Sequence, residues 1–228
     1  TVGVGQNLAI TASGAITDSG VVTVAGTTTF DNSGGSDAAI DLGSSSTYTG
    51  NVSFTTDAGS DVTITDNSAF AIQSGLNVNN LSITSTGSVT DLGDLDIDGT
   101  LTVSAAGQTV DLSGGGSNDI TGGVTLTGAA VTLGDSSATV IAGITATGAL
   151  SVTSGGAISQ SGAIDADSTA SFAAGANAIT LTNASNDFSG AVSLSNSGSN
   201  DVSLTDANAL DLGTVGVGQN LTITTGGD

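Results

Sequence analysis

Eight consecutive residues, TVGVGQNL, occur twice in this chain, at residues 1–8 and again at residues 214–221. Identity over eight residues is not expected by chance in a chain of 228 residues, so the sequence contains an internal repeat. The offset between the two copies is 213 in sequence number (214 − 1). A repeat favours folds in which each unit stacks on a near-copy of itself.

A shorter period divides this offset into three. The segments that open at four leucines read LAITASGAITDSG (Leu8), LSITSTGSVTDLG (Leu81), LSVTSGGAISQSG (Leu150) and LTITTGGD (Leu221). The differences between their sequence numbers are 73 (81 − 8), 69 (150 − 81) and 71 (221 − 150). The sequence therefore predicts one continuous domain over 1–228, with units at approximately 8–80, 81–149 and 150–220 and a fourth beginning at 221.

Within each unit, aliphatic residues alternate with Thr, Ser or Asp at intervals of two, as in Val192/Leu194 and Val202/Leu204. This is the period of a β-strand with one buried face. Gly, Asn and Asp separate the strands, as in NSGSND at 196–201, and these residues favour turns. The pattern predicts an all-β fold, for which a sandwich, a propeller and a solenoid are the alternatives.

A parallel β-helix, or β-solenoid, explains the repeat better than the other two architectures. A sandwich needs no repeat, and a propeller blade runs to ~40–50 residues with larger aromatic contacts. Coils of ~18–24 residues would place three or four coils in each unit of ~71 residues, and about 10–12 coils in the chain. We expect right-handed winding, because parallel crossovers are almost always right-handed.

The composition excludes several functions. The chain has no Lys, Arg, His, Cys or Met, and its formal charge is −21. Nucleic-acid binding requires cationic side chains, and disulfides require Cys, so neither is expected. No apolar run approaches the ~20 residues of a membrane span, so no membrane insertion is expected. A chain without Met is expected to be a processed product or an excerpt. High charge and many Gly favour disorder, but the regular aliphatic spacing opposes it.

Catalysis has few candidate residues. Without His or Lys, a Ser–His type of nucleophile is unavailable, and only carboxylate pairs remain. The candidates are Asp165/Asp167 and the trio Asp94, Asp96 and Asp98. Because a spacing of two places them on the outer face of a strand, we predict a surface role, no enzyme activity and no cofactor other than candidate calcium.

The segment DLDIDG at 94–99 resembles the start of an EF-hand calcium loop. However, Ala105 occupies the position at which such a loop carries a bidentate Glu. Leu95 and Ile97 also fit an inward strand face, so a calcium site and a solvated acidic strand both stay open. Most other aspartates are expected in turns, including Asp61, Asp66, Asp119, Asp187, Asp201 and Asp206.

Three runs carry a resemblance to a known family: LSVTSGGAISQSGA (150–163), ANAITLTNASNDFSGAVSLS (176–195) and VSLTDANALDLGTVGVGQNLTIT (202–224). They resemble the central β-helix repeats of filamentous-haemagglutinin-type adhesins, which Gram-negative bacteria secrete by the two-partner route. The resemblance implies a right-handed β-helix that forms the structural stalk of a large secreted protein at the bacterial cell surface. The conserved N-terminal secretion domain of that family has no counterpart in this sequence.

A second function is compatible with the same repeat. The chain would then be a subunit or repeat of an extracellular filament or sheath that assembles through β-helix contacts. In either case the expected partners are other copies or neighbouring repeats of the same protein. A host or neighbouring-cell surface would be bound through parts outside this chain.

Overall fold

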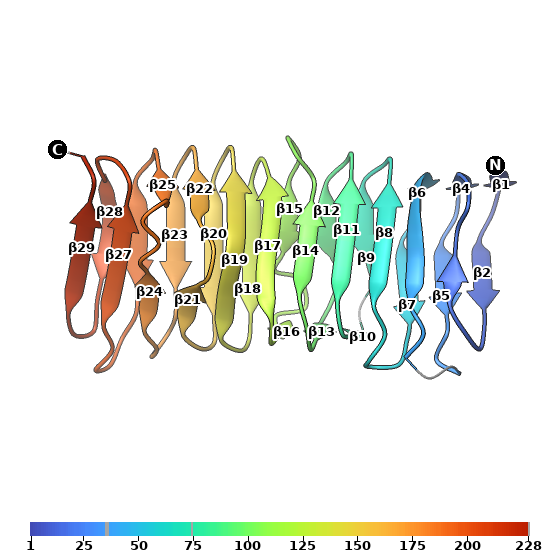
Figure 1. Ribbon diagram of the computed structural model, residues 1–228, viewed down its shortest axis with the longest axis horizontal. Coiled ribbons are helices and arrows are strands. Elements are labelled where there is room, and N and C mark those ends of the chain that lie inside the picture. Colours follow the sequence, from blue (N-terminus) through green and yellow to red (C-terminus); the bar gives the residue numbers. More distant parts are fainter. Residues whose placement is uncertain (35–36, 74, 228) are drawn as a thin grey trace.

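The computed structural model describes residues 1–34, 37–73 and 75–227, and every regular element in them is a β-strand (Figure 1). The strands lie across a long axis, and the two ends of the chain lie at opposite ends of the stack. Each strand pairing found between described residues is parallel, as is that of β1 (Val2–Val4) with β4 (Val22–Val24). The described part contains no helix that could cross a membrane. The predicted β-solenoid is confirmed.

Three sheets contain the 29 strands found among the described residues. The 11-stranded sheet consists, in spatial order, of β2 (Leu8–Thr11), β5 (Thr28–Asp31), β7 (Val52–Thr55), β9 (Phe70–Ile72), β12 (Val89–Asp91), β15 (Val110–Leu112), β18 (Val131–Asp135), β20 (Leu150–Ser154), β23 (Ala170–Ala173), β26 (Val192–Ser195) and β28 (Leu212–Gly216). It supplies one strand per turn, which gives about eleven turns.

The 15-stranded sheet forms the opposite wall of the rod and also includes short strands along one edge. Its main path consists of β1, β4, β6 (Ile40–Tyr48), β8 (Val62–Asp66), β11 (Leu81–Ser85), β14 (Leu101–Ser104), β17 (Gly123–Gly128), β19 (Thr139–Ala146), β21 (Ile158–Gln160), β24 (Ile179–Leu181), β27 (Val202–Asp206) and β29 (Leu221–Thr225). Off this path lie β3 (Ile16–Thr17), β22 (Ile164–Ala166) and β25 (Asp187–Phe188). The 3-stranded sheet consists of β10 (Leu76–Val78), β13 (Leu95–Ile97) and β16 (Asp119–Ile120).

The length of one turn follows from the register between neighbouring strands. In the 11-stranded sheet, Val131 lies beside Leu150, so this turn advances the sequence number by 19 (150 − 131). Thr28 lies beside Val52, so that turn advances it by 24 (52 − 28). The other steps in this sheet fall between these values, within the ~18–24 residues predicted from the sequence.

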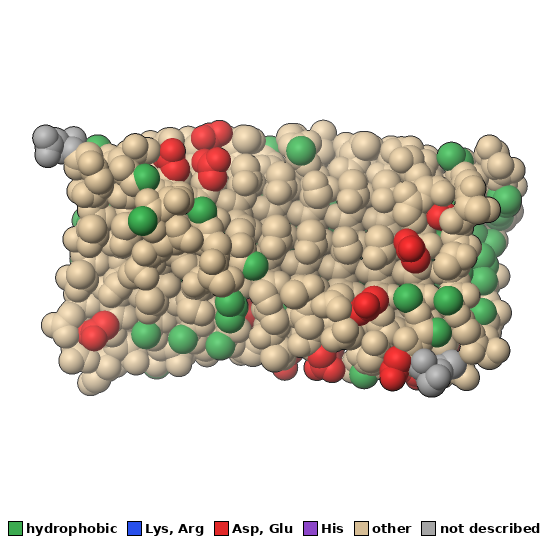
Figure 2. Space-filling view, viewed as in Figure 1, with side chains coloured by type: hydrophobic (Ala, Val, Ile, Leu, Met, Phe, Trp, Pro, Cys, Tyr) green, Lys and Arg blue, Asp and Glu red, His purple; other side chains and the backbone are tan. Residues whose placement is uncertain are grey.

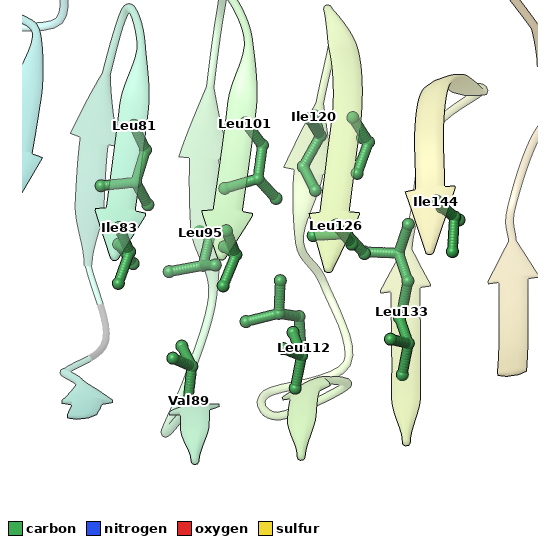
Figure 3. Close-up of a cluster of buried hydrophobic side chains, with 14 of the residues drawn as sticks. Leu81, Ile83, Val89, Leu95, Leu101, Leu112, Ile120, Leu126, Leu133 and Ile144 are labelled. Atoms are coloured by element: carbon green, nitrogen blue, oxygen red, sulfur yellow. The ribbon is translucent and has the colours of Figure 1, made fainter. Parts of the chain in front are cut away.

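Equivalent strands place like side chains on top of one another along the lumen. Leu81 of β11 lies between Val62 of β8 and Leu101 of β14, and all three side chains are buried. Figure 3 shows Leu81 and Leu101 at matching positions of adjacent strands. Each such side chain contributes ~1.5–3 kcal/mol through burial. The aliphatic residues that the sequence predicts to point inward therefore line the lumen, and the polar residues between them point outward.

Close stacking of turns also explains glycine at corners. Gly50 lies over Gly26 one turn below, and a Cβ added at Gly50 would approach the Gly26 carbonyl oxygen to 2.5 Å. A side chain at this corner would push adjacent turns apart, against the spacing of ~4.8 Å that their hydrogen bonds require.

Successive units occupy opposite walls. Leu8 and Leu150 lie in the 11-stranded sheet, seven strands apart, whereas Leu81 and Leu221 lie in the 15-stranded sheet, also seven strands apart. Two units therefore make seven turns and one unit makes three and a half. The sequence predicts three or four coils per unit. The structure adds that each unit is related to the next by half a turn about the long axis.

The half-turn is visible in the short strands that close one edge of the rod or the other, which we call the third side. In the third unit, and in the first unit before β10, the chain passes from the opposite wall through the third side to the 11-stranded sheet, as in β21–β22–β23. In the second unit the order is reversed, as in β12–β13–β14. Figure 1 accordingly shows β22 and β25 along the upper edge, and β10, β13 and β16 along the lower edge.

Candidate functional site

Buried and partly buried polar side chains recur once in every unit, at the corner where the third side begins. Each group, which we call a polar triad, takes one side chain from each of three consecutive turns. The triads are Asp18, Ser46 and Asp66 in the first unit, Asp91, Asn118 and Asp135 in the second, and Gln160, Asn186 and Asp206 in the third. Their spacing follows the repeat (91 − 18 = 73 and 160 − 91 = 69 for the first members).

The second triad shows what these side chains do. Asn118 Oδ1 accepts a hydrogen bond of 2.9 Å from the backbone N–H of Leu95, the first residue of β13. Asp135 Oδ1 accepts one of 3.4 Å from the backbone N–H of Ile120. Asn118 Nδ2 donates to Asp91 Oδ2 at 2.8 Å. Side-chain oxygens therefore accept hydrogen bonds from backbone N–H groups of the third side, which would otherwise be buried without an acceptor.

The other two triads make the same bonds with partly different side chains. The matching hydrogen bonds are Val22 N to Ser46 Oγ (3.0 Å), Ile164 N to Asn186 Oδ1 (3.0 Å), Tyr48 N to Asp66 Oδ1 (3.1 Å) and Phe188 N to Asp206 Oδ1 (3.2 Å). Conservation of the acceptor position between units, despite changes of residue type, indicates that the triad holds the third side in register.

The prediction that Asp66 and Asp206 lie in turns is wrong, because they are the last residues of β8 and β27. Both are almost completely buried, with exposures of 0% and 1%. The reason is the two-residue period, because Asp66 continues the inward series of Val62 and Ile64. The sequence contained this signal, but the turn preference of Asp obscured it. Asp61 and Asp201 lie outside strands and are exposed. The turn prediction is also wrong for Asp119, which is exposed, and Asp187, which is partly buried, because they are the first residues of β16 and β25.

Burial changes the acidity of these groups. Removal from water raises the pKa of the Asp66 carboxyl above its usual range, although hydrogen bonds from Tyr48 and Ser68 oppose the shift. Burial likewise raises the pKa of Asp91, against the hydrogen bond from Asn118. The nearby Tyr48 ring is buried, and burial raises the pKa of its hydroxyl to about 12.

The acidic trio Asp94, Asp96 and Asp98 lies outward on and beside β13, alternating with buried Leu95 and Ile97. Side chains two residues apart on a strand are ~6.6 Å apart, whereas calcium ligands lie ~2.3–2.6 Å from the ion. Among the described residues no group of three or more such side chains converges as a metal site would. The calcium site stays a prediction of the sequence.

Asp96 instead takes part in a ladder between turns. It lies beside Asn77, whose Nδ2 donates to Asp96 Oδ2 at 2.8 Å, and beside Asp119 on the other neighbouring strand. Partial burial between strands raises the pKa of Asp96, and the charges of Asp98 and Asp119 raise it further. This ladder lies on the lower edge, where Figure 2 shows acidic side chains near β13 and β16.

The pair Asp165 and Asp167 occupies the equivalent place in the third unit, on the opposite edge. Asp165 lies beside Asp187, and partial burial followed by the charges of Asp167 and Asp187 raises the pKa of Asp165. Both members of the pair are exposed, on and beside β22. The chain has no His, Lys or Arg to act as a base or cationic clamp beside them. The geometry fits a charged surface.

A shallow groove lies over the 11-stranded sheet in the first unit. Near it, Val52 of β7 lies beside Ile72, whereas Val89 of β12 lies beside Phe70, so the register shifts by two residues. The groove is polar and has a volume of about 380 Å³. Its lining residues are Thr27, Thr29, Asn51, Ser53 and Gln73.

The repeat that produces this geometry matches a family described as "Repeats of unknown function (DUF5649)" over residues 1–58, 59–127, 128–195 and 199–228. The chain belongs to this repeat family. The last three matches begin at a constant offset of 22 before Leu81, Leu150 and Leu221 (81 − 59, 150 − 128 and 221 − 199), so the family repeat has the period of our units and a different starting point. No curated protein and no solved structure matches the chain.

Proposed function

We propose that this chain is a non-catalytic stalk segment of a large secreted bacterial surface adhesin of the filamentous-haemagglutinin type. The observation that carries the proposal is the uninterrupted parallel stack of about eleven turns built from one repeating unit. A solenoid of this kind gains length by adding units, because each turn contacts only its neighbours. A surface stalk needs to be long, and repetition of one simple unit provides that length.

The surface of the rod supports a spacer role. The outward positions of the strands are mostly Thr, Ser, Asn and Asp, and Figure 2 shows a face with scattered acidic side chains and no cationic ones. A net charge of −21 keeps such rods apart in solution and limits nonspecific adhesion to anionic surfaces. Specific adhesion would then lie in other parts of the parent protein.

The proposal also excludes catalysis in this segment. The acidic pairs lie on exposed positions without a neighbouring base, and the buried carboxyls of the triads are engaged by backbone N–H groups. Incubation of the purified chain with a panel of polysaccharides is expected to release no more sugar than buffer alone. Turnover that depends on Asp165 or Asp167 would contradict this part of the proposal.

Immunoelectron microscopy tests the stalk. Antibodies raised against the purified chain should label the outside of intact source cells, at a distance from the membrane that grows with the number of units in the parent gene. Label that appears only after the cells are opened would overturn the proposal.

A further inference from the structure

We infer that the polar groove over the 11-stranded sheet binds a small neutral saccharide. The groove lies on the side of the rod, at the strands β5, β7 and β9 of three successive turns (Figure 1). Its lining side chains carry hydroxyls and amides, and none of them carries a charge. The inference gives the side of the rod a ligand, goes beyond the stalk role and does not depend on it.

Three of the lining side chains form a column across these turns. Thr29 lies beside Ser53 in the register between β5 and β7. Gln73 N donates to Val52 O at 3.1 Å, which places Gln73 beside Ser53 on the next turn. Neighbouring strands are ~4.8 Å apart, so the column is about 10 Å long. A ligand in the groove can therefore contact three turns at once.

The hydroxyls of this column keep acceptor capacity for a ligand. Thr29 Oγ1 and Ser53 Oγ are 3.0 Å apart and share a hydrogen bond, and Ser53 Oγ donates to Thr28 O at 3.3 Å. Because the hydrogen of Ser53 is used on Thr28 O, Thr29 is the donor between the two hydroxyls. Each hydroxyl oxygen has two lone pairs, so Thr29 keeps both and Ser53 keeps one. Both oxygens can therefore accept hydrogen bonds from a ligand.

The two amides of the groove supply donors. Asn51 is exposed at the groove. Gln73 is half-buried, and among the described residues its Nε2 has no hydrogen-bond partner although it is shielded from solvent. A shielded donor without an acceptor is unfavourable. Rotation of this amide toward the groove would let a ligand oxygen accept from Nε2. The groove therefore combines donors and acceptors within one small area.

The matching serine of the third unit has a backbone partner instead. Ser193 holds the place in β26 that Ser53 holds in β7. Thr214 N of the following turn donates to Ser193 Oγ at 3.1 Å. Gly213 stands where the first unit has Gln73, and a Cβ added at Gly213 would approach Ser193 Oγ to 2.6 Å. Backbone therefore fills the space in front of this serine, whereas Ser53 faces the groove.

The chemistry of the lining selects the class of ligand. An anionic ligand would find no cationic side chain in this chain, and the net charge of −21 would repel it. The lining holds no carboxylate for a cationic ligand. A flat aromatic ligand would lack a stacking partner, because Phe30, Phe54 and Phe70 of these strands are buried. Hydroxyls and amides pair best with a neutral molecule that carries many hydroxyls.

The size of the groove and one neighbouring side chain also fit a sugar. A volume of about 380 Å³ is at the small end of the range for ligand pockets. Leu92 N donates to Ile72 O at 2.9 Å, so Leu92 lies beside Gln73 on the following turn. Leu92 is 52% exposed and can contact the C–H groups of a sugar ring while the column binds its hydroxyls.

NMR titration of the isotope-labelled full chain with glucose, galactose and mannose tests the site. At least one of these sugars should shift the signals of Asn51, Ser53 and Gln73 saturably. We expect a dissociation constant on the order of 1 mM, because the groove is shallow and the ligand is small. Glucuronate, which is anionic, should bind about tenfold more weakly or not at all. The inference would be overturned by no saturable shift with any of the three sugars, by equal binding of glucuronate, or by shifts of equal size along the whole rod.

Matched substitutions test whether the lining residues are responsible. Asn51→Ala/Gln73→Ala removes both amides and should weaken binding about tenfold. Thr29→Val removes a hydroxyl and keeps the branched shape, so it should weaken binding to a similar extent. Thr132→Val, at a half-buried threonine on the outer face of β18 in the same sheet, should leave binding unchanged. Circular dichroism checks that each variant is folded. Binding that survives the double substitution, or that the two valine variants affect equally, would also overturn the inference.

Discussion

Asn118 donates from Nδ2 to Oδ2 of Asp91 at 2.8 Å, and both side chains are buried at the corner between two walls of the rod. The same amide also donates to the backbone carbonyls of Leu112 and Gly134, and its oxygen accepts from Leu95 N. One side chain thereby connects three consecutive turns. Such a residue is a hydrogen-bonding centre inside an otherwise aliphatic lumen.

Asn118→Ala should therefore destabilise the rod strongly. The substitution leaves the Leu95 N–H without an acceptor and removes one of the donors to the buried Asp91 carboxylate, which keeps the Gly114 N–H, at a cost of about 2–4 kcal/mol. The measurement is the midpoint of urea unfolding followed by circular dichroism. Asn51→Ala, at an exposed asparagine, is the control and should change stability by less than about 0.5 kcal/mol. Equal effects of the two substitutions would show that the triad does not hold the corner.

The buried carboxyls predict a pH dependence. The folded-state pKa of Asp66 and of Asp91 is raised, so each group favours the folded state fully at pH values below its unfolded pKa of ~3.9. That contribution is lost as the pH rises through the folded pKa. The melting temperature should therefore fall between about pH 4 and neutrality.

The variant Asp66→Asn distinguishes the pH effect of the buried carboxyl from that of the general repulsion among the 21 aspartates. The amide oxygen can still accept from Tyr48 N, while the charge is removed, so the pH dependence should become flatter. Asp41→Asn, at an exposed position of β6, should leave the slope nearly unchanged. A slope that changes equally in both variants would assign the effect to surface charge.

The half-turn relation predicts that a whole unit can be removed. Deletion of residues 81–149 joins Asn80 to Leu150, which then takes the place of Leu81 in the opposite wall. We expect a folded rod shortened by three and a half turns, or ~17 Å, in small-angle X-ray scattering. Deletion of 81–150 is the control. It places Ser151 at the inward position of Leu81 and turns Val152 outward, which reverses the two faces of this strand, and it should abolish cooperative folding.

Tyr48 is the only tyrosine, and the chain has no Trp, so its titration can be followed without interference. Absorbance at the wavelength of tyrosinate should rise near pH 12 in the folded rod. The same titration in concentrated urea should occur near the ordinary value of ~10. Identical titrations in the two conditions would contradict the burial of the ring.

The aspartate ladders predict an effect of calcium. Asp96 beside Asp119, and Asp165 beside Asp187, place like charges on neighbouring strands. Millimolar calcium should raise the melting temperature, and chelation should lower it, because a bound cation reduces the repulsion. Asp96→Asn should reduce the response. Superimposable melts with chelator and with excess calcium would contradict this prediction.

The wall strands could be predicted from the sequence because one rule generates them. Aliphatics at a spacing of two, as in Val202 and Leu204, are inward wherever a strand forms, and the unit length follows from the leucines that open each unit. The buried triads could not be predicted by composition, because Asp, Asn and Ser also favour turns. Asp66 is distinguished from the turn residue Asp61 only by its phase relative to Val62 and Ile64. The outward trio at Asp94 was easier to place, because Leu95 and Ile97 fix its phase.

Because each unit makes three and a half turns, the number of units in the parent protein decides which side of the rod equivalent residues face. Two units separated by an even number of units have equivalent residues on the same side of the rod. Two units separated by an odd number have them on opposite sides. A recombination event that gains or loses a single unit would therefore rotate all the units that follow it by half a turn about the long axis. A loop or glycan site carried once per unit would decorate the shaft in two opposed rows, able to engage objects on both flanks.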